Sequence, residues 1–243
     1  MNVVLLHSSG LAGAQWRKLT AELEKRGATV RAPDLTGHGR SPPLPAGEPF
    51  SFHRDVEAVE KILAELGPAH LVGHSYGGLV ALHVARRASL RSLALFDPVA
   101  FAVLDPHEDA DALAELPHDL EWRDDEAGRE RWLETFVDFW GGAGAWRALR
   151  EDARAEFRRV AWVVREGVRS LMEDTTPLDA YRTFTFPALL LTAEHSPLPA
   201  RRVIQRLGQA IPNARIATIP GAGHLAPVTH ADRVNAVLLE ALR

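Results

Sequence analysis

The chain of 243 residues contains no cysteine. This absence excludes disulfide bridges, thiolate metal sites and a cysteine nucleophile, so any nucleophilic side chain must be of another kind. The sequence also lacks a basic leader at its amino end and any apolar run long enough to cross a bilayer. We therefore expect a soluble cytoplasmic protein without a membrane segment.

A strong excess of charge is also missing, because the formal net charge is only −4 and the charged residues are interspersed. No basic surface is expected to attract nucleic acid or anionic lipid. Walker-type phosphate loops are absent. Gly221, Gly223 and Ala226 match a dinucleotide fingerprint in spacing, but too little chain follows them for a βαβ unit. We predict no cofactor.

Two histidines, His70 and His74, have the i, i+4 spacing of a helical zinc site. They lie across a predicted strand and turn, however, where this spacing does not bring two side chains together. We predict no metal site.

Short apolar runs alternate with amphipathic helical patterns along most of the chain. Predicted strands include residues 3–6, 93–96, 188–191 and 215–219. This alternation is typical of a mostly parallel sheet flanked by helices, an α/β fold.

The pattern changes between residues 98 and 183, where no strand is indicated and five of the six tryptophans lie. We predict a helical insertion over 98–183 that interrupts one core domain formed by residues 1–97 and 184–243.

The motif Gly73-His74-Ser75-Tyr76-Gly77 fits G-x-S-x-G and lies between an apolar strand and a helix. This context is required for a nucleophile elbow, where glycines allow a strained turn that exposes the serine. The same turn places the Tyr76 backbone N–H at the start of a helix, where it could bind an oxyanion. Ser75 is the predicted nucleophile.

This motif, together with the order of the predicted elements along the chain, resembles the α/β-hydrolases. The resemblance implies the α/β-hydrolase fold with an inserted helical cap. His7-Ser8-Ser9-Gly10 resembles the family's H-G-x-G loop, which implies the Ser9 amide as the second oxyanion donor beside Tyr76. Ser8 replaces the usual glycine. The segment 34–41 also resembles a family loop, to which we assign no catalytic role.

Among eleven histidines, His224 follows the last predicted strand, where the family carries its catalytic histidine. A serine hydroxyl is a poor nucleophile near neutral pH and needs an imidazole to accept its proton. His224 is the predicted base.

The third member of a triad is less clear from the sequence. Ser196 occupies the position where the family usually has an aspartate, and a serine cannot stabilise an imidazolium by charge. Asp97, at the end of the strand that follows the elbow, is the first candidate because some lipases of this fold carry their acid there. Glu194 is the alternative.

The resemblance implies a hydrolase that cleaves a small carboxylic ester or related acyl compound through an acyl-enzyme at Ser75. Carbon–carbon, thioester, lactone or amide hydrolysis would use the same serine. A non-catalytic or weakly catalytic ligand-binding member is a further alternative. The insertion would cover the site, and the expected partner is a small-molecule acyl substrate. A serine nucleophile argues against the epoxide hydrolases and haloalkane dehalogenases, which need a carboxylate there.

Overall fold

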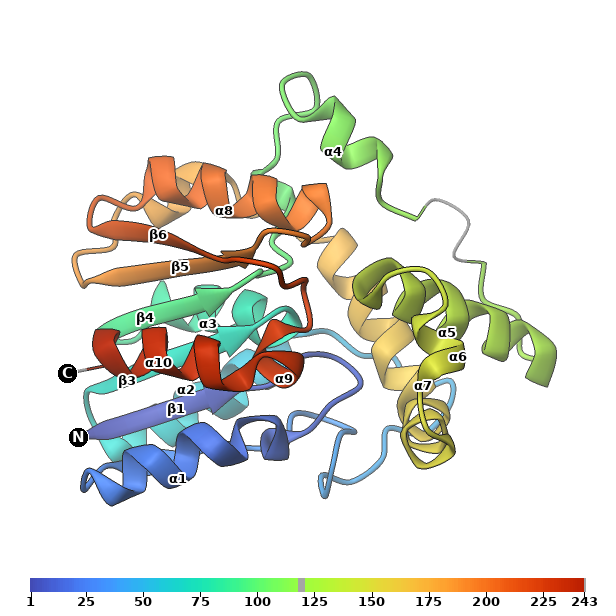
Figure 1. The fold of residues 1–243 in the computed structure, drawn as a ribbon, viewed down its shortest axis with the longest axis horizontal. Helices are drawn as coiled ribbons and strands as arrows, with labels where there is room; N and C mark the ends of the chain where they lie inside the picture. The colour runs from blue at the N-terminus through green and yellow to red at the C-terminus, as the bar shows by residue number, and fades with distance from the viewer. Residues whose placement is uncertain (118–120, 243) are drawn as a thin grey trace.

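The computed structural model describes residues 1–117 and 121–242. Within these residues six parallel strands form one sheet in the spatial order β2-β1-β3-β4-β5-β6 (Figure 1). The strands are β1 (Asn2–Leu6), β2 (Thr29–Arg31), β3 (Ala69–His74), β4 (Leu90–Phe96), β5 (Ala188–Ala193) and β6 (Ala214–Ile219). The α/β fold with a parallel sheet, predicted from the alternating pattern, is confirmed.

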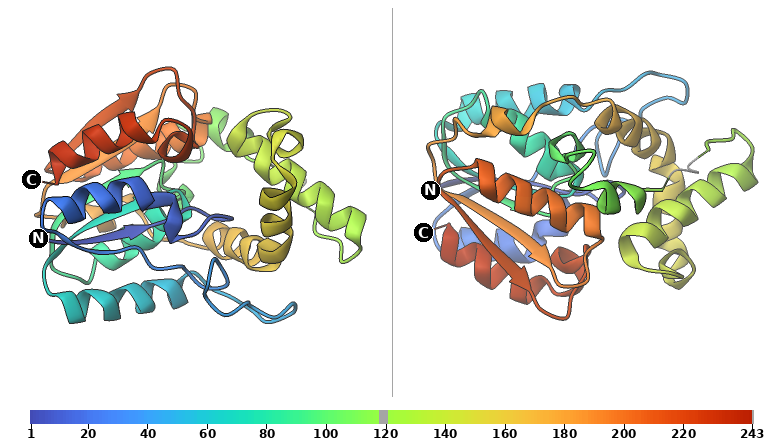
Figure 2. Two further views of the ribbon diagram at one scale, coloured as in Figure 1. Left: turned by 60° about the horizontal axis from the view of Figure 1, so that its bottom comes forward. Right: turned by 90° about the horizontal axis from the view of Figure 1, so that it is seen from above.

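Helices cover both faces of this sheet (Figure 2). The helices α1 (Arg17–Lys25) and α10 (Ala231–Ala241) pack on one face, and α2 (His53–Leu66), α3 (Tyr76–Ala85) and α8 (Leu198–Ala210) pack on the other. Two shorter elements, η1 (Gly13–Trp16) and α9 (Ala226–Thr229), precede α1 and α10.

The strand β3 and the helix α3 form the most enclosed part of the fold, since every residue of both is buried. A parallel strand covered by helices on both faces needs apolar residues throughout rather than in alternation. Ser75 is the single residue between these two elements. It therefore lies between two elements that are buried along their whole length.

Between β4 and β5 the chain leaves the sheet, and the described part of this segment contains helices and no strand. Its elements are η2 (Phe101–Val103), α4 (Ala110–Ala114), α5 (Glu126–Gly141), α6 (Ala145–Ala148), α7 (Glu151–Met172) and η3 (Leu178–Tyr181). Helices α5, α6 and α7 lie beyond the carboxyl ends of the strands rather than on a face of the sheet (Figures 1 and 2).

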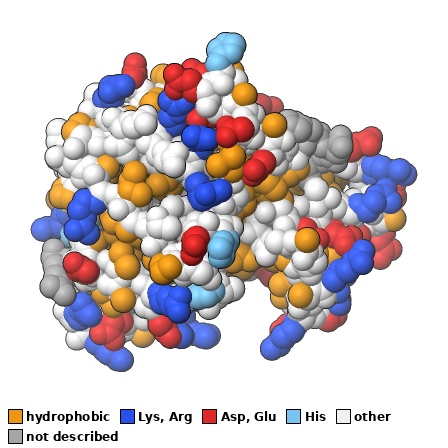
Figure 3. All heavy atoms as spheres, turned by 45° about the horizontal axis from the view of Figure 1, so that its top comes forward, with side chains coloured by type: hydrophobic (Ala, Val, Ile, Leu, Met, Phe, Trp, Pro, Cys, Tyr) orange, Lys and Arg blue, Asp and Glu red, His pale blue; other side chains and the backbone are white. Residues whose placement is uncertain are grey.

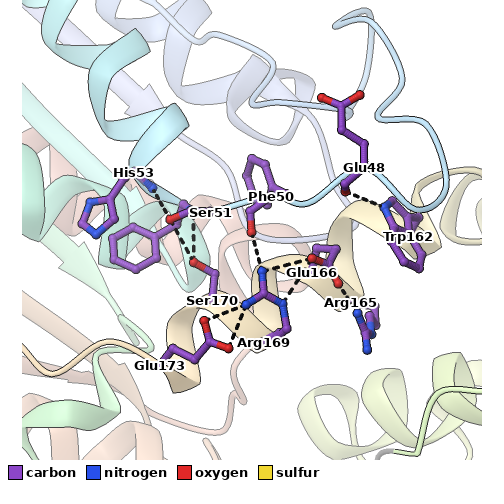
Figure 4. A network of polar contacts seen from close by, with 11 residues as sticks. Glu48, Phe50, Ser51, His53, Trp162, Arg165, Glu166, Arg169, Ser170 and Glu173 are labelled. Atoms are coloured by element: carbon purple, nitrogen blue, oxygen red, sulfur yellow. Dashed lines mark hydrogen bonds and ion pairs between the residues drawn. The ribbon is translucent and has the colours of Figure 1, made fainter.

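Helix α7 ties this segment to the loop that precedes α2 (Figure 4). The Arg169 guanidinium donates to the Phe50 carbonyl at 2.9 Å, and the Trp162 indole N–H donates to the Glu48 carbonyl at 3.1 Å. These two loop carbonyls, which lie outside helices and strands, thus accept hydrogen bonds from side chains of α7. Side chains of this long helix join the segment to the loop before α2, and ion pairs of Asp109 with Arg202 and Arg206 join it to α8.

On the face shown in Figure 3, acidic and basic side chains are interspersed, with apolar side chains between them. None of the described helices is both long and apolar enough to cross a membrane.

Candidate active site

Ser75 has the strained backbone that a nucleophile elbow requires, with φ 56° and ψ −118°. The neighbouring glycines make the turn possible. A Cβ on Gly73 would lie 2.4 Å from the Gly77 carbonyl oxygen, and a Cβ on Gly77 would lie 2.5 Å from the His7 carbonyl oxygen. The Ser75 N–H donates to the Phe96 carbonyl at 2.9 Å, which fixes the turn to β4. The G-x-S-x-G spacing is therefore a steric requirement of this turn.

His224 and Asp97 meet at the carboxyl edge of the sheet, although 127 positions separate them in sequence. The distance from His224 Nδ1 to Asp97 Oδ2 is 3.2 Å, and both side chains are buried. An imidazole whose Nδ1–H faces a carboxylate keeps Nε2 free to accept a proton. The sequence-predicted base and its first candidate acid are thus brought together.

The alternative acid, Glu194, lies elsewhere. Its side chain is exposed, and its Oε2 accepts a hydrogen bond from the Gly221 N–H at 2.8 Å. Glu194 therefore binds the backbone of the loop that carries His224 and forms no hydrogen bond with the imidazole.

Ser196, which stands where the family usually has its acid, also reaches Asp97. Its hydroxyl donates to Asp97 Oδ2 at 2.5 Å, and its own oxygen accepts from the Ala193 N–H at 3.3 Å. Asp97 Oδ1 is buried and finds no hydrogen-bond partner among the described residues. Both hydrogen bonds to this carboxylate therefore converge on one oxygen.

His74, inside the elbow motif, orients the loop that carries His224. Its Nε2 lies 2.9 Å from the His224 carbonyl oxygen. A carbonyl can only accept, so His74 is the Nε2–H tautomer. Burial lowers the pKa of His74 well below its ordinary value, and the nearby His224 lowers it further. His74 is therefore a neutral, fully buried donor that holds the backbone of His224.

The residues of the two predicted oxyanion donors, Ser9 and Tyr76, line one cavity together with Ser75. Among the described residues neither the Ser9 amide nor the Tyr76 amide donates to another protein group. The amides next to Ser9 are both bound, since Ser8 N–H donates to Gln15 Oε1 at 3.1 Å and Gly10 N–H donates to His38 Nε2 at 3.1 Å. The Ser8 backbone has no positive φ, so a serine there imposes no strain.

Two buried histidines hold the loop of Ser9 in place. The His7 Nδ1–H donates to the Ser8 carbonyl at 2.8 Å, and its Nε2 accepts from the Leu35 N–H at 2.9 Å. His38 follows the same pattern, because its Nδ1–H donates to the Thr36 carbonyl at 2.9 Å while Nε2 accepts from Gly10. Burial lowers the pKa of His7 to about 3, with a further contribution from His38, and burial also lowers the pKa of His38. Both rings are therefore neutral at neutral pH.

Ser75 lies between two cavities of similar size, about 190 and 200 Å³. The first cavity is lined by Ser9, Ser75, Tyr76, Val99, Phe101, Leu116, Pro117, Phe136, Phe139, Trp140, Val168, Leu171 and Met172. The second cavity is lined by Ser8, Ser9, Leu11, Ser75, Phe136, Val137, Trp140, Leu149, Phe157, His224, Leu225, Val228 and Thr229. Among residues 1–117 and 121–242, no Lys, Arg, Asp or Glu lines either cavity.

Trp140, near the end of α5, lies against His224, with 4.1 Å between the ring centroids and 32° between the ring planes. Sequence reasoning missed this contact, as it missed the hydrogen bond of Ser196 to Asp97. Five tryptophans in one segment did not indicate which of them faces the histidine. The contact of Ser196 could have been suspected from the sequence, because a polar side chain stands there at the position where the family usually has its acid.

No cluster of three or more histidine, aspartate or glutamate side chains suited to a metal occurs in residues 1–117 and 121–242.

The fold and this arrangement of side chains are those of a class of enzymes, the hydrolases with an α/β fold. Residues 3–237 match the alpha/beta hydrolase family, and the chain belongs to that family. The family resemblance drawn from the sequence and the prediction of a hydrolase are confirmed.

Named relatives are similar to this chain over most or part of its length. A pimeloyl-[acyl-carrier protein] methyl ester esterase from Stenotrophomonas maltophilia is 32% identical over 248 residues, which cover 98% of this chain and 91% of that protein. Lipase LipV from Mycobacterium tuberculosis is 37% identical over 100 residues, covering 40% of this chain and 36% of the lipase. Among solved structures, a thermophilic esterase from Thermogutta terrifontis gives a TM-score of 0.73 at 23% identity, covering all of this chain and 89% of the other.

Proposed function

We propose that this protein is a carboxylic ester hydrolase that works through an acyl-enzyme on Ser75. The observation that carries the proposal is the pairing of His224 Nδ1 with the buried Asp97 Oδ2 at 3.2 Å, with His224 and Ser75 lining the same cavity. A hydrolase of this family with a histidine and an elbow serine lining the same cavity has the groups that acyl transfer needs. Relatives named as methyl ester esterases agree with this reaction.

In the proposed reaction the Ser75 oxygen attacks the ester carbonyl carbon and its proton passes to His224 Nε2. The carbonyl electron pair becomes an oxyanion, which the amides of Ser9 and Tyr76 bind. The bond to the alcohol oxygen then breaks, and His224 returns the proton to the departing alkoxide. Water, deprotonated by the same imidazole, releases the acid and restores Ser75. Asp97 stabilises the imidazolium that forms twice in each cycle.

The segment 98–183 is proposed to act as a cap on the site. Its helices α5 and α7 supply apolar side chains to both cavities, including Phe136 and Trp140. An enclosure that excludes water would strengthen the electrostatic interactions around the reacting ester. The core domain would then be residues 1–97 and 184–243, with the catalytic side chains on its loops.

The proposal is tested by incubating the protein with a fluorophosphonate, which phosphonylates an activated serine, and locating the adduct by peptide mass spectrometry. We expect rapid labelling at Ser75, none in Ser75→Ala and a loss of at least roughly 10³-fold in His224→Ala. Medium-chain methyl esters are the first substrates to assay, given the named relatives. A folded wild-type protein that is neither labelled nor active on any ester would overturn the proposal and favour a ligand-binding role.

A further inference from the structure

Asp55 carries a fully buried carboxylate that the proposed triad does not use. It is the third residue of α2, and both of its oxygens accept hydrogen bonds. Oδ1 accepts from the Thr36 N–H at 2.8 Å and from the Thr36 hydroxyl at 2.7 Å, and Oδ2 accepts from the Tyr76 hydroxyl at 2.7 Å. A buried charge is costly unless hydrogen bonds satisfy it, and the amino end of a helix stabilises it further. Asp55 is therefore a fixed point to which two other segments of the chain are bound.

The first of these bonds fixes Tyr76, whose backbone amide is one of the two proposed oxyanion donors. Burial raises the pKa of the Tyr76 hydroxyl well above its ordinary value, and the nearby Asp55 raises it further, so the hydroxyl keeps its proton and donates. Tyr76 follows Ser75, whose φ of 56° is strained, and such a turn persists only where its surroundings hold it. The Ser75 N–H is bound to the Phe96 carbonyl before the turn. The bond from Tyr76 to Asp55 holds the chain after it.

The bonds from Thr36 lead to the other proposed donor, the Ser9 amide. The Thr36 carbonyl accepts from the His38 Nδ1–H at 2.9 Å. His38 Nε2 accepts in turn from the N–H of Gly10, the residue after Ser9, at 3.1 Å. Each of these bonds is buried or partly buried. Hydrogen bonds through Thr36 and His38 therefore join Asp55 to the loop of Ser9.

The two amides must point at one oxygen, although they belong to loops that are far apart in the sequence, and a small misplacement of either donor weakens its bond to the oxyanion. We propose that Asp55 is a positioning residue for the oxyanion hole, one that aligns the amides of Ser9 and Tyr76 toward the same oxygen. No residue of the described segment 34–41 lines either cavity, so this segment acts only through the loop of Ser9. The inference rests on the proposed function of Ser75.

A residue that aligns oxyanion donors affects kcat more than KM, because charge develops on the carbonyl oxygen only as Ser75 attacks. Loss of a whole donor costs about 10² to 10³-fold in kcat, so misalignment in Asp55→Ala should lower kcat by roughly 30-fold or more and change KM by less than about threefold. Asp55→Asn keeps an acceptor oxygen for Thr36, and its amide N–H can donate to the Tyr76 hydroxyl. It should recover most of the lost kcat.

Asp174 offers a matched control at the other end of α3. Its carboxylate is also buried and also binds a side chain of that helix, since its Oδ2 lies 3.2 Å from His83 Nε2. Asp174 lines neither cavity. Asp174→Ala and Asp55→Ala should both lower the midpoint of thermal unfolding, and Asp55→Ala alone should lower kcat. If Asp55→Ala does not fold, Tyr76→Phe removes one of the two branches, leaves the amide in place and should lower kcat by roughly fivefold or more.

An alkyl trifluoromethyl ketone reports on the oxyanion hole directly. The Ser75 oxygen adds to its carbonyl carbon, the Ser75 proton passes to His224, and the ketone oxygen becomes an oxyanion at the two amides. Its inhibition constant should rise in Asp55→Ala by a factor within about threefold of the fall in kcat/KM. The matched trifluoromethyl alcohol has no carbonyl and forms no adduct, so its inhibition constant should change by less than about twofold.

These outcomes are distinguishable from failure of the proposed function. Absence of Ser75 labelling and of all esterase activity in the wild type rejects the serine esterase itself. In an active protein, a loss of kcat in Asp55→Ala no greater than in Asp174→Ala, an unchanged inhibition constant for the ketone, or a Tyr76→Phe variant with wild-type kcat overturns the positioning role of Asp55 and leaves the esterase standing.

Discussion

The Ser196 hydroxyl donates a hydrogen bond of 2.5 Å to Asp97 Oδ2, the same oxygen that lies 3.2 Å from His224 Nδ1. A hydroxyl that donates to an ionised carboxylate stabilises its charge and fixes its orientation. Ser196 therefore acts on the proposed triad through Asp97, from the place where related enzymes carry the acid itself.

The first prediction separates the two candidate acids. Asp97→Asn keeps the size of the side chain but removes the charge that stabilises the imidazolium, so kcat/KM should fall by between about 10² and 10⁴-fold. Glu194→Gln should change kcat/KM by less than about twofold, because Glu194 is exposed and a glutamine oxygen can still accept from the Gly221 N–H. Steady-state hydrolysis of one methyl ester measures both. Equal losses in the two variants would reject Asp97 as the acid.

The second prediction moves the acid to the position of Ser196. Because the Ser196 oxygen lies within hydrogen-bond distance of Asp97 Oδ2, a carboxylate at 196 starts beside the space that faces His224 Nδ1. Ser196→Asp in the Asp97→Asn background should recover at least roughly tenfold of the lost fluorophosphonate labelling rate. Ser196→Asn in the same background is the matched control and should recover none. Recovery by the asparagine as well would show that charge at 196 is not responsible.

The extent to which the sequence predicts this site depends on how local each feature is. The elbow at Ser75 is determined by a strand, a turn and a helix that follow one another, so its glycine spacing is informative. The contact between Ser196 and Asp97 joins two strand ends that are 99 positions apart, and no local pattern encodes it. Trp140 reaches His224 only because α5 crosses the carboxyl edge of the sheet, and a helical pattern does not specify that placement.

The third prediction concerns pH and stability. The pKa of His7 falls from its ordinary value near 6.5 to about 3 on folding, mainly through burial, and the pKa of His38 is also lowered by burial. Since the unfolded chain takes up protons first, this stability is fully present above about pH 6.5 and is lost as the pH falls toward the folded pKa. For each of these histidines, the free energy of unfolding should fall by up to about 1.4 kcal/mol for each unit by which the pH is lowered.

Urea unfolding at several pH values between 6.5 and 4.5 measures this slope. His38→Asn should make it shallower, because that ring no longer titrates in the unfolded chain. His107→Asn, at an exposed position, is the control and should leave the slope unchanged. A wild-type stability that stays constant over this range would contradict the neutral, buried state of His7 and His38.

The fourth prediction concerns the close approach of backbones at the elbow. Gly77→Ala places a Cβ 2.5 Å from the His7 carbonyl oxygen, and neither backbone can move without disturbing β1 or α3. We expect a loss of at least about 3 kcal/mol in unfolding free energy or no folded protein. Gly27→Ala is the control: it meets no atom within 4 Å, and its φ of 78° should cost only about 1 to 2 kcal/mol. Similar losses in the two variants would show that the close approach to Leu6 and His7 adds nothing beyond the ordinary cost of replacing a glycine.

The last prediction concerns the aromatic contact between the proposed cap and the proposed base. Trp140 covers one face of the His224 ring and lines both cavities, so it limits the orientations of the imidazole and keeps water from it. Trp140→Ala should slow fluorophosphonate labelling of Ser75 by roughly tenfold, and Trp140→Phe should retain most of the rate, because a smaller ring can still cover the imidazole. Trp122→Ala is the control, since Trp122 packs on Trp132 at 5.7 Å between centroids and lines neither cavity. An unchanged rate in Trp140→Ala, with the thermal unfolding of all variants compared, would restrict Trp140 to a packing role.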